Sequence, residues 1–62
     1  MDNSAINEIR IEAFKRYGGS IRIVRLHTAD GGVRYYVCRT RHGNIIDVLA
    51  GGVEKHKIME QL

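Results

Sequence analysis

The sequence predicts a small α+β fold in the order helix, strand, strand, strand, helix, with a three-stranded antiparallel meander and the helices mainly on one face. Seven glycines, gathered at four places, divide the chain into five segments. The outer two segments have apolar residues at helical spacing, and the inner three are rich in β-branched and aromatic residues. We expect residues 1–62 to form one small domain, because they are too few for two.

The first segment, residues 3–17, predicts a helix. Ser4 or Asn3 can cap it, and Gly18 can end it in a left-handed conformation. Ile11 points away from the apolar stripe that should face the core. That stripe consists of Ile6, Ile9, Ala13 and Tyr17.

The three central segments, residues 21–28, 33–41 and 44–50, predict strands. An Asp30-Gly31 pair lies in the first link, and such a pair is a strong hairpin signal. His42-Gly43 can form a tight second turn, since glycine accepts a positive φ. Two short turns between successive strands predict an antiparallel meander.

The last segment, residues 53–62, predicts a short helix with Glu54 near its positive end. Its apolar side contains Ile58, Met59 and Leu62. At ten residues it is too short to be stable alone, so it should pack on the sheet.

Centring the two turns on Asp30-Gly31 and His42-Gly43 fixes a register and two sheet faces. Arg22 and Arg39 should lie at the far end of the core face. The predicted core face holds Val24, Leu26, Val33, Tyr35, Val37, Ile46, Val48 and Ala50. The predicted opposite face holds Ile21, Ile23, Arg25, His27, Arg34, Tyr36, Cys38, Thr40, Ile45, Asp47 and Leu49.

The opposite face combines apolar and cationic side chains, whereas a solvent face is usually polar. An uncovered patch of this kind indicates an interaction surface. Two alternatives remain open: one helix covers each face, or the face joins two copies in a homodimer, which would help a small core reach stability.

The charge distribution predicts binding of nucleic acid. The chain carries a net charge of +3 and has a pI near 9.4. Arginine suits phosphate, and a strand-face tyrosine can stack on a base. We therefore expect a non-enzymatic, nucleic-acid-binding regulatory protein. Its expected binding residues are Arg22, Arg25, His27, Arg34, Tyr36, Arg39, Arg41, Lys55 and Lys57.

The apolar part of the same face supports a second hypothesis, a protein-binding inhibitor or adaptor of the kind that phages and mobile elements encode, for example against defence complexes. Cations would steer such a module toward an acidic partner or toward a complex that handles nucleic acid. The expected protein interface consists of Ile11, Ile21, Ile23, Tyr36, Ile45 and Leu49.

Catalysis, cofactors and metals find no support in the sequence. Cys38 is the only cysteine, which fits a reducing cytoplasm, and the histidines have no metal-ligand spacing. No apolar run is long enough to span a bilayer, and the polar start, residues 1–4, is unlike a secretory signal. We expect no small-molecule substrate. The element order alone is similar to that of double-stranded-RNA-binding domains, and no motif of that family is present.

Overall fold

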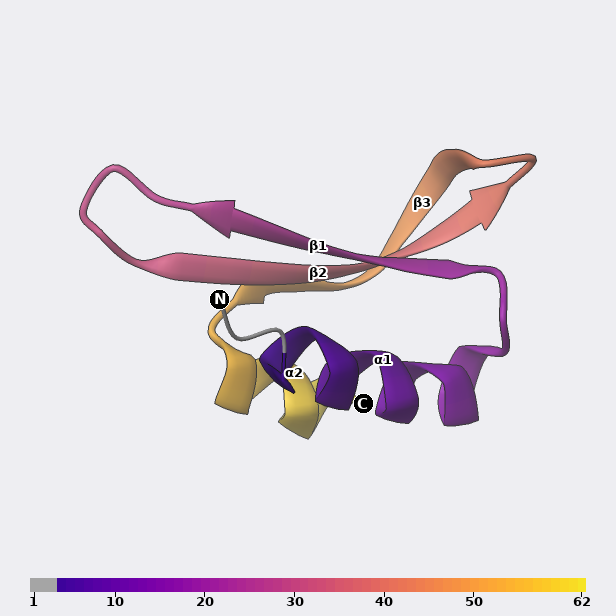
Figure 1. Cartoon of the computed structure of the whole chain (residues 1–62), viewed down its shortest axis with the longest axis horizontal. Helices are drawn as coiled ribbons and strands as arrows, with labels where there is room; N and C mark the ends of the chain where they lie inside the picture. Colours follow the sequence, from indigo (N-terminus) through magenta and orange to yellow (C-terminus); the bar gives the residue numbers. More distant parts are fainter. Residues whose placement is uncertain (1–3) are drawn as a thin grey trace.

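The computed structural model describes residues 4–62 and has the expected element order. Both helices lie on one face of an antiparallel sheet with the strand order β1-β2-β3 (Figure 1). Asn3, one of the two predicted caps, lies outside the described residues. The elements are α1 (Ser4–Tyr17), β1 (Ile21–His27), β2 (Val33–Arg41), β3 (Asn44–Val53) and α2 (Lys55–Gln61).

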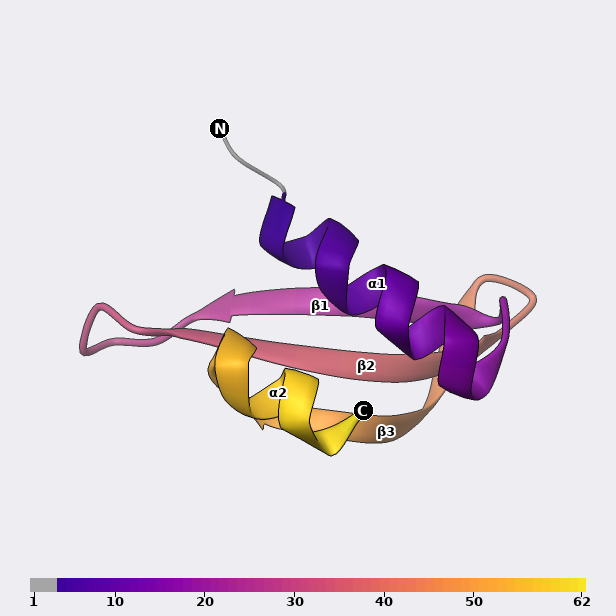
Figure 2. The ribbon, with the colours of Figure 1, turned by 90° about the horizontal axis from the view of Figure 1, so that it is seen from below.

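The core lies between β2 and the two helices. Figure 2 shows α1 crossing β1 and β2 diagonally, with α2 beside it below β2 and β3. An ion pair of 2.6 Å between Lys55 Nζ and Glu8 Oε2 joins the two helices. The buried cluster contains Ile9 and Ala13 of α1, Tyr35 and Val37 of β2, and Ile58 of α2. The predicted stripe of α1 therefore faces the core, and Ile11 is exposed as expected.

The β1–β2 register differs by one residue from the prediction. Thr28 N–H donates to Gly32 C=O at 2.9 Å, so three residues, and not two, form the loop. Gly31 takes a φ of +86°, which is the left-handed position of a three-residue hairpin loop. The Asp30-Gly31 signal correctly predicted a hairpin but gave the wrong loop length.

A one-residue shift exchanges the two faces of β1. Ile23 lies opposite Val37, on the helix-covered side, and Val24 lies opposite Tyr36, on the other side. Ile21 and Ile23 therefore pack against the core, and Val24 and Leu26 do not. The predictions for these four residues were wrong. Both sets are apolar, so the alternation within β1 could not identify the buried face.

The pairing of β2 with β3 follows the predicted turn and then departs from it. Arg41 pairs with Asn44 around His42-Gly43, as expected. Three register shifts follow, and each changes which side chains share a face. Four predictions for β3 were wrong. Leu49 packs against the core, Asp47 pairs with Arg39 on the helix-covered side, Val48 pairs with Cys38 on the other side, and Ile46 is exposed.

Strand β3 continues through Gly51-Gly52, where the sequence predicted a break. Gly51 has a φ of +147°, and a Cβ there would lie 2.7 Å from both the Tyr35 carbonyl oxygen and Tyr36 Cα. Glycine is thus required because β2 approaches too closely for any side chain. Helix α2 then begins at Lys55, two residues later than predicted, after Glu54 in extended conformation.

The Asp30 carboxylate accepts hydrogen bonds within the β1–β2 loop, so the stability of the loop should depend on pH. The Thr28 hydroxyl and the Gly32 N–H both donate hydrogen bonds to the Asp30 carboxylate. These bonds lower the pKa of Asp30 below its ordinary value of 3.8, and the Thr28 bond has the larger effect. The ionised Asp30 therefore stabilises the folded state. This contribution is complete above the unfolded-state pKa of Asp30 and is lost as the pH falls through its lower folded-state pKa. We expect Thr28→Val to raise the Asp30 pKa toward 3.8, measured by carboxyl-carbon NMR titration. An unchanged pKa would contradict the assignment of the Thr28 hydroxyl as the main cause.

Candidate functional site

The sheet face turned away from both helices is the candidate site, and we call it the open face. Its residues are set by the observed pairing, in which the even-numbered residues of β1 and β2 share the side opposite the core. The open face comprises Arg22, Val24, Leu26, Arg34, Tyr36, Cys38, Thr40, Ile45, Val48 and Gly51.

Aliphatic side chains cross the open face and reach solvent. Leu26 is 49% exposed, Ile45 45% and Val48 55%. The helices are both engaged on the other side of the sheet, so nothing in the described part of the chain covers these groups. A face of this kind is apolar enough to bind a partner.

Tyr36 lies across β3 on the open face. It pairs with Gly51, and its ring atoms Cε1 and Oη lie 3.9 Å from where a Cβ of Gly52 would be. The ring therefore rests on the two glycines, which leave room for it by lacking side chains. Tyr36 is half-buried in this position.

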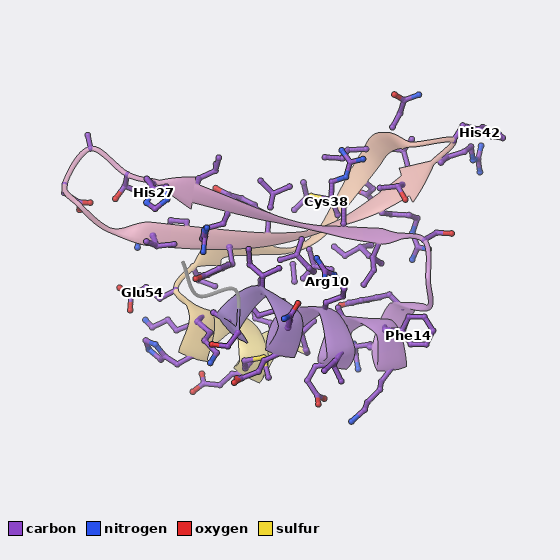
Figure 3. All side chains as sticks on the ribbon, in the orientation of Figure 1. Arg10, Phe14, His27, Cys38, His42 and Glu54 are labelled. Carbon is purple, nitrogen blue, oxygen red and sulfur yellow. The ribbon has the colours of Figure 1, made fainter. Side chains whose placement is uncertain are left out.

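Cys38 occupies the centre of the open face, between Arg22 and Val48 across the strands. Figure 3 shows its side chain on the side of the sheet away from the helices. The thiol is only 3% exposed, and this burial raises its pKa, which the Arg22 guanidinium opposes more weakly. Since the thiolate is the reactive form, Cys38 acts as an apolar filler. The sequence had predicted Asp47 on the same face as Cys38, and that was wrong.

The structure separates four residues that the sequence had predicted to lie together. Arg34 and Tyr36 lie on the open face as expected. Arg25 pairs with Tyr35 and His27 with Val33, so both lie on the helix-covered side. The one-residue shift of β1 is the cause. Arg22, predicted on the core face, lies on the open face instead, while Arg39 lies on the helix-covered side opposite Ile21 and Asp47.

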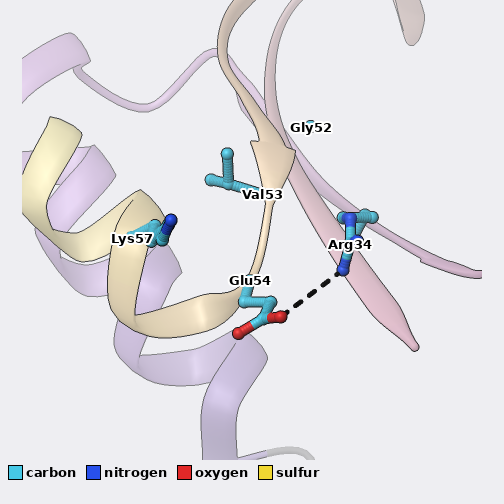
Figure 4. A pocket seen from close by; sticks show the side chains of 5 residues that line it. All are labelled: Arg34, Gly52, Val53, Glu54 and Lys57. Atoms are coloured by element: carbon cyan, nitrogen blue, oxygen red, sulfur yellow. Dashed lines mark ion pairs between the residues drawn. The ribbon is translucent and has the colours of Figure 1, made fainter.

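Acidic side chains neutralise part of the predicted phosphate-binding set. Glu54 Oε1 lies 3.8 Å from Arg34 Nη1, and both border a hollow of about 140 Å³ that Lys57 also lines (Figure 4). Lys55 is held by Glu8. These acidic partners were not predictable from the sequence, because they come from elements distant along the chain. Only the packing of α1 and α2 reveals them.

Two arginines and a histidine lie at the turn between β2 and β3. Arg22 Nη2 donates to the Gly43 carbonyl oxygen at 3.3 Å, which brings it to the turn that contains His42 and follows Arg41. His42 has a φ of +53° and Gly43 one of +80°, as a two-residue hairpin turn requires. The end of the sheet therefore carries the positive charges of Arg22 and Arg41.

Residues 4–62 hold no group of three or more His, Cys, Asp or Glu side chains placed to bind a metal ion. None of the helices in the described part of the chain is both long and apolar enough to cross a lipid bilayer. Comparison of the chain with protein-family models, with curated proteins and with solved structures finds no match.

Proposed function

We propose that the protein is a small non-enzymatic binding module that docks on another protein through the open face. The observation that carries this proposal is that Leu26, Ile45 and Val48 are exposed on the sheet face opposite to the one on which both helices pack. Burying such groups in a partner would release about 25 cal/mol for each Å² removed from water.

The charges of the open face favour an acidic partner over a second copy. Arg22 lies on the face, Arg34 is paired with Glu54 at its border, and the residues of the face include no carboxylate. Two copies joined face to face would bring these arginines together, whereas a partner with a carboxylate rim would complement them. We therefore favour an acidic protein surface with an apolar centre, in preference to the homodimer that the sequence also suggested.

The proposal can be tested by placing a photoreactive amino acid at position 48 and, as a control, at position 60, which lies on α2 on the other side of the sheet. The protein crosslinked from position 48 alone is identified, purified and titrated against three forms of the chain. We expect Leu26→Asp to weaken binding about tenfold or more, which corresponds to about 1.4 kcal/mol. Ile11→Asp, equally exposed but on α1, should bind as the wild type does. Equal effects of the two substitutions would refute docking through the open face.

Nucleic acid is the second candidate partner, and the cationic turn favours it. Arg22, Arg41 and His42 lie together there. If nucleic acid is the partner, the protein should retain an oligonucleotide at low salt, and the affinity should fall steeply as the salt concentration rises. Arg22→Glu should then weaken oligonucleotide binding, and Leu26→Asp should not. The same set of variants therefore separates the two candidates.

A further inference from the structure

The free edge of β1 is regular, whereas the edge of β3 is not. All seven β1 residues pair with β2 without a register shift, and β3 has three shifts against the same strand. A partner strand can add to a straight edge, while bulges disrupt such addition. Among the described elements, β1 is therefore the edge suited to strand addition.

The direction of the β1 backbone groups follows from its pairing. Thr28 N–H bonds Gly32 and Thr40 N–H bonds Ser20, so even-numbered positions of β1 exchange hydrogen bonds with β2. Because the bonding alternates along an antiparallel strand, the N–H and C=O groups of the odd-numbered positions point away from β2. Ile21, Ile23 and His27 thus direct their backbone groups to the free edge.

Helix α1 forms a ledge next to this edge. Figure 2 shows the N-terminal half of α1 extending past β1 on the side away from β2. The Glu8–Lys55 ion pair turns the Glu8 side of α1 toward α2. At 100° per residue, the row of Ile6, Arg10 and Phe14 then lies on the opposite side of α1, which is the side that faces the free edge of β1.

The ledge is partly apolar and accessible. Phe14 is 59% exposed and lies at the end of α1 beside the link to β1 (Figure 3). Apolar side chains on one face of an added strand would rest on this ledge.

The charges around the edge indicate the chemistry of the added strand. Strand β1 contains two arginines and a histidine but no acid. Arg10 adds a cation from the ledge, and Glu8 lies on the far side of α1. A second copy would oppose cations to cations, whereas glutamate or aspartate would complement them.

We propose that the β1 edge binds an extended acidic segment of a partner protein by strand addition. Its side chains on the α1 side are apolar over Ile6 and Phe14, and the positive charge of β1 and Arg10 attracts its acidic side chains. This inference deepens the proposed function by naming a second contact for a protein partner, on a surface distinct from the open face. The main-chain hydrogen bonds would supply affinity and the alternating side chains would supply specificity.

The test is a titration of the ¹⁵N-labelled chain with an end-blocked peptide of alternating glutamate and valine, to millimolar concentration. We expect saturable shifts of the Ile21, Ile23 and His27 amides and of Phe14, and slower hydrogen exchange at Ile23. A glutamate–proline peptide of equal charge cannot complete the hydrogen bonds and should leave these signals unchanged. No shift, equal shifts with both peptides, or shifts confined to the open face would overturn the proposal. Pairing of two copies through β1 without peptide would overturn it as well.

A matched pair of variants tests the hydrogen bonds themselves. His27→Pro removes one outward N–H at an edge position that tolerates proline, and we expect peptide affinity to fall about fivefold, the equivalent of one hydrogen bond. His27→Ala keeps the N–H and should bind the peptide more tightly than His27→Pro does; equal affinity of the two variants counts against the proposal. If His27→Pro fails to fold, the test is amide hydrogen exchange at Ile23 of the wild-type chain, which should become slower when the peptide is added. Val48→Asp should leave peptide binding unchanged, so failure at this edge is distinguishable from failure of the open face.

Discussion

Replacing Ile9 with alanine is expected to leave much of the protein unfolded at room temperature. Ile9 is fully buried between α1 and β2, where it meets Val37 and Ile58. Removing a buried isoleucine side chain costs about 2–5 kcal/mol. A core of this size seldom supplies more than about 3–5 kcal/mol in all, so one substitution removes most of the stability. Thermal unfolding followed by circular dichroism measures the effect.

Ile11 provides the matched control in the same helix. It is the same residue type two positions along the chain, but its side chain is 57% exposed. We expect Ile11→Ala to change the free energy of unfolding by less than about 0.5 kcal/mol. Similar melting temperatures for the two variants would contradict the burial of Ile9 and, with it, the packing of α1 on the sheet.

A methyl group at Gly51 is expected to detach the end of β3 and destabilise the packing of α2. The added Cβ would meet the backbone of Tyr35 and Tyr36 at 2.7 Å, and backbone atoms in a paired strand cannot move aside. The positive φ of +147° adds strain of about 1–3 kcal/mol. We expect Gly51→Ala to cost more than Gly43→Ala in urea unfolding.

Gly43 separates the two causes of this effect. It also has a positive φ, +80°, but no atom lies within 4 Å of an added Cβ. Its replacement by alanine should therefore cost only the backbone term, about 1–2 kcal/mol. Equal losses at the two positions would show that β2 does not crowd Gly51.

Element order and most element ends were predictable from the sequence because local signals determine them. Gly18 ends α1 with a φ of +86° and its N–H on the Phe14 carbonyl at 2.9 Å, as the glycine after a helical stripe indicates. The two-residue turn at His42-Gly43 was likewise predicted. These features depend on a few neighbouring residues, and the sequence displays all of them.

The faces of the sheet were not predictable, because they depend on loop length and on bulges. Strand β1 is apolar at both odd and even positions, so either register buries two aliphatic residues. The extra loop residue and the bulges of β3 decide the outcome, and the close approach of Tyr36 to Gly51 is visible only in three dimensions. As a result the predicted face and the open face differ at many positions. The open face keeps Arg34, Tyr36, Cys38, Thr40 and Ile45, loses Ile21, Ile23, Arg25, His27, Asp47 and Leu49, and gains Arg22, Val24, Leu26, Val48 and Gly51.

The irregular pairing of β3 also limits how copies of the chain can polymerise. A fibre needs two compatible edges on every molecule, one to receive the next copy and one to be received. This sheet has one such edge, at β1, since the shifts along β3 interrupt the other. Edge-to-edge growth would therefore stop after two copies, and the protein can keep one strand open for recognition without becoming a seed for filaments.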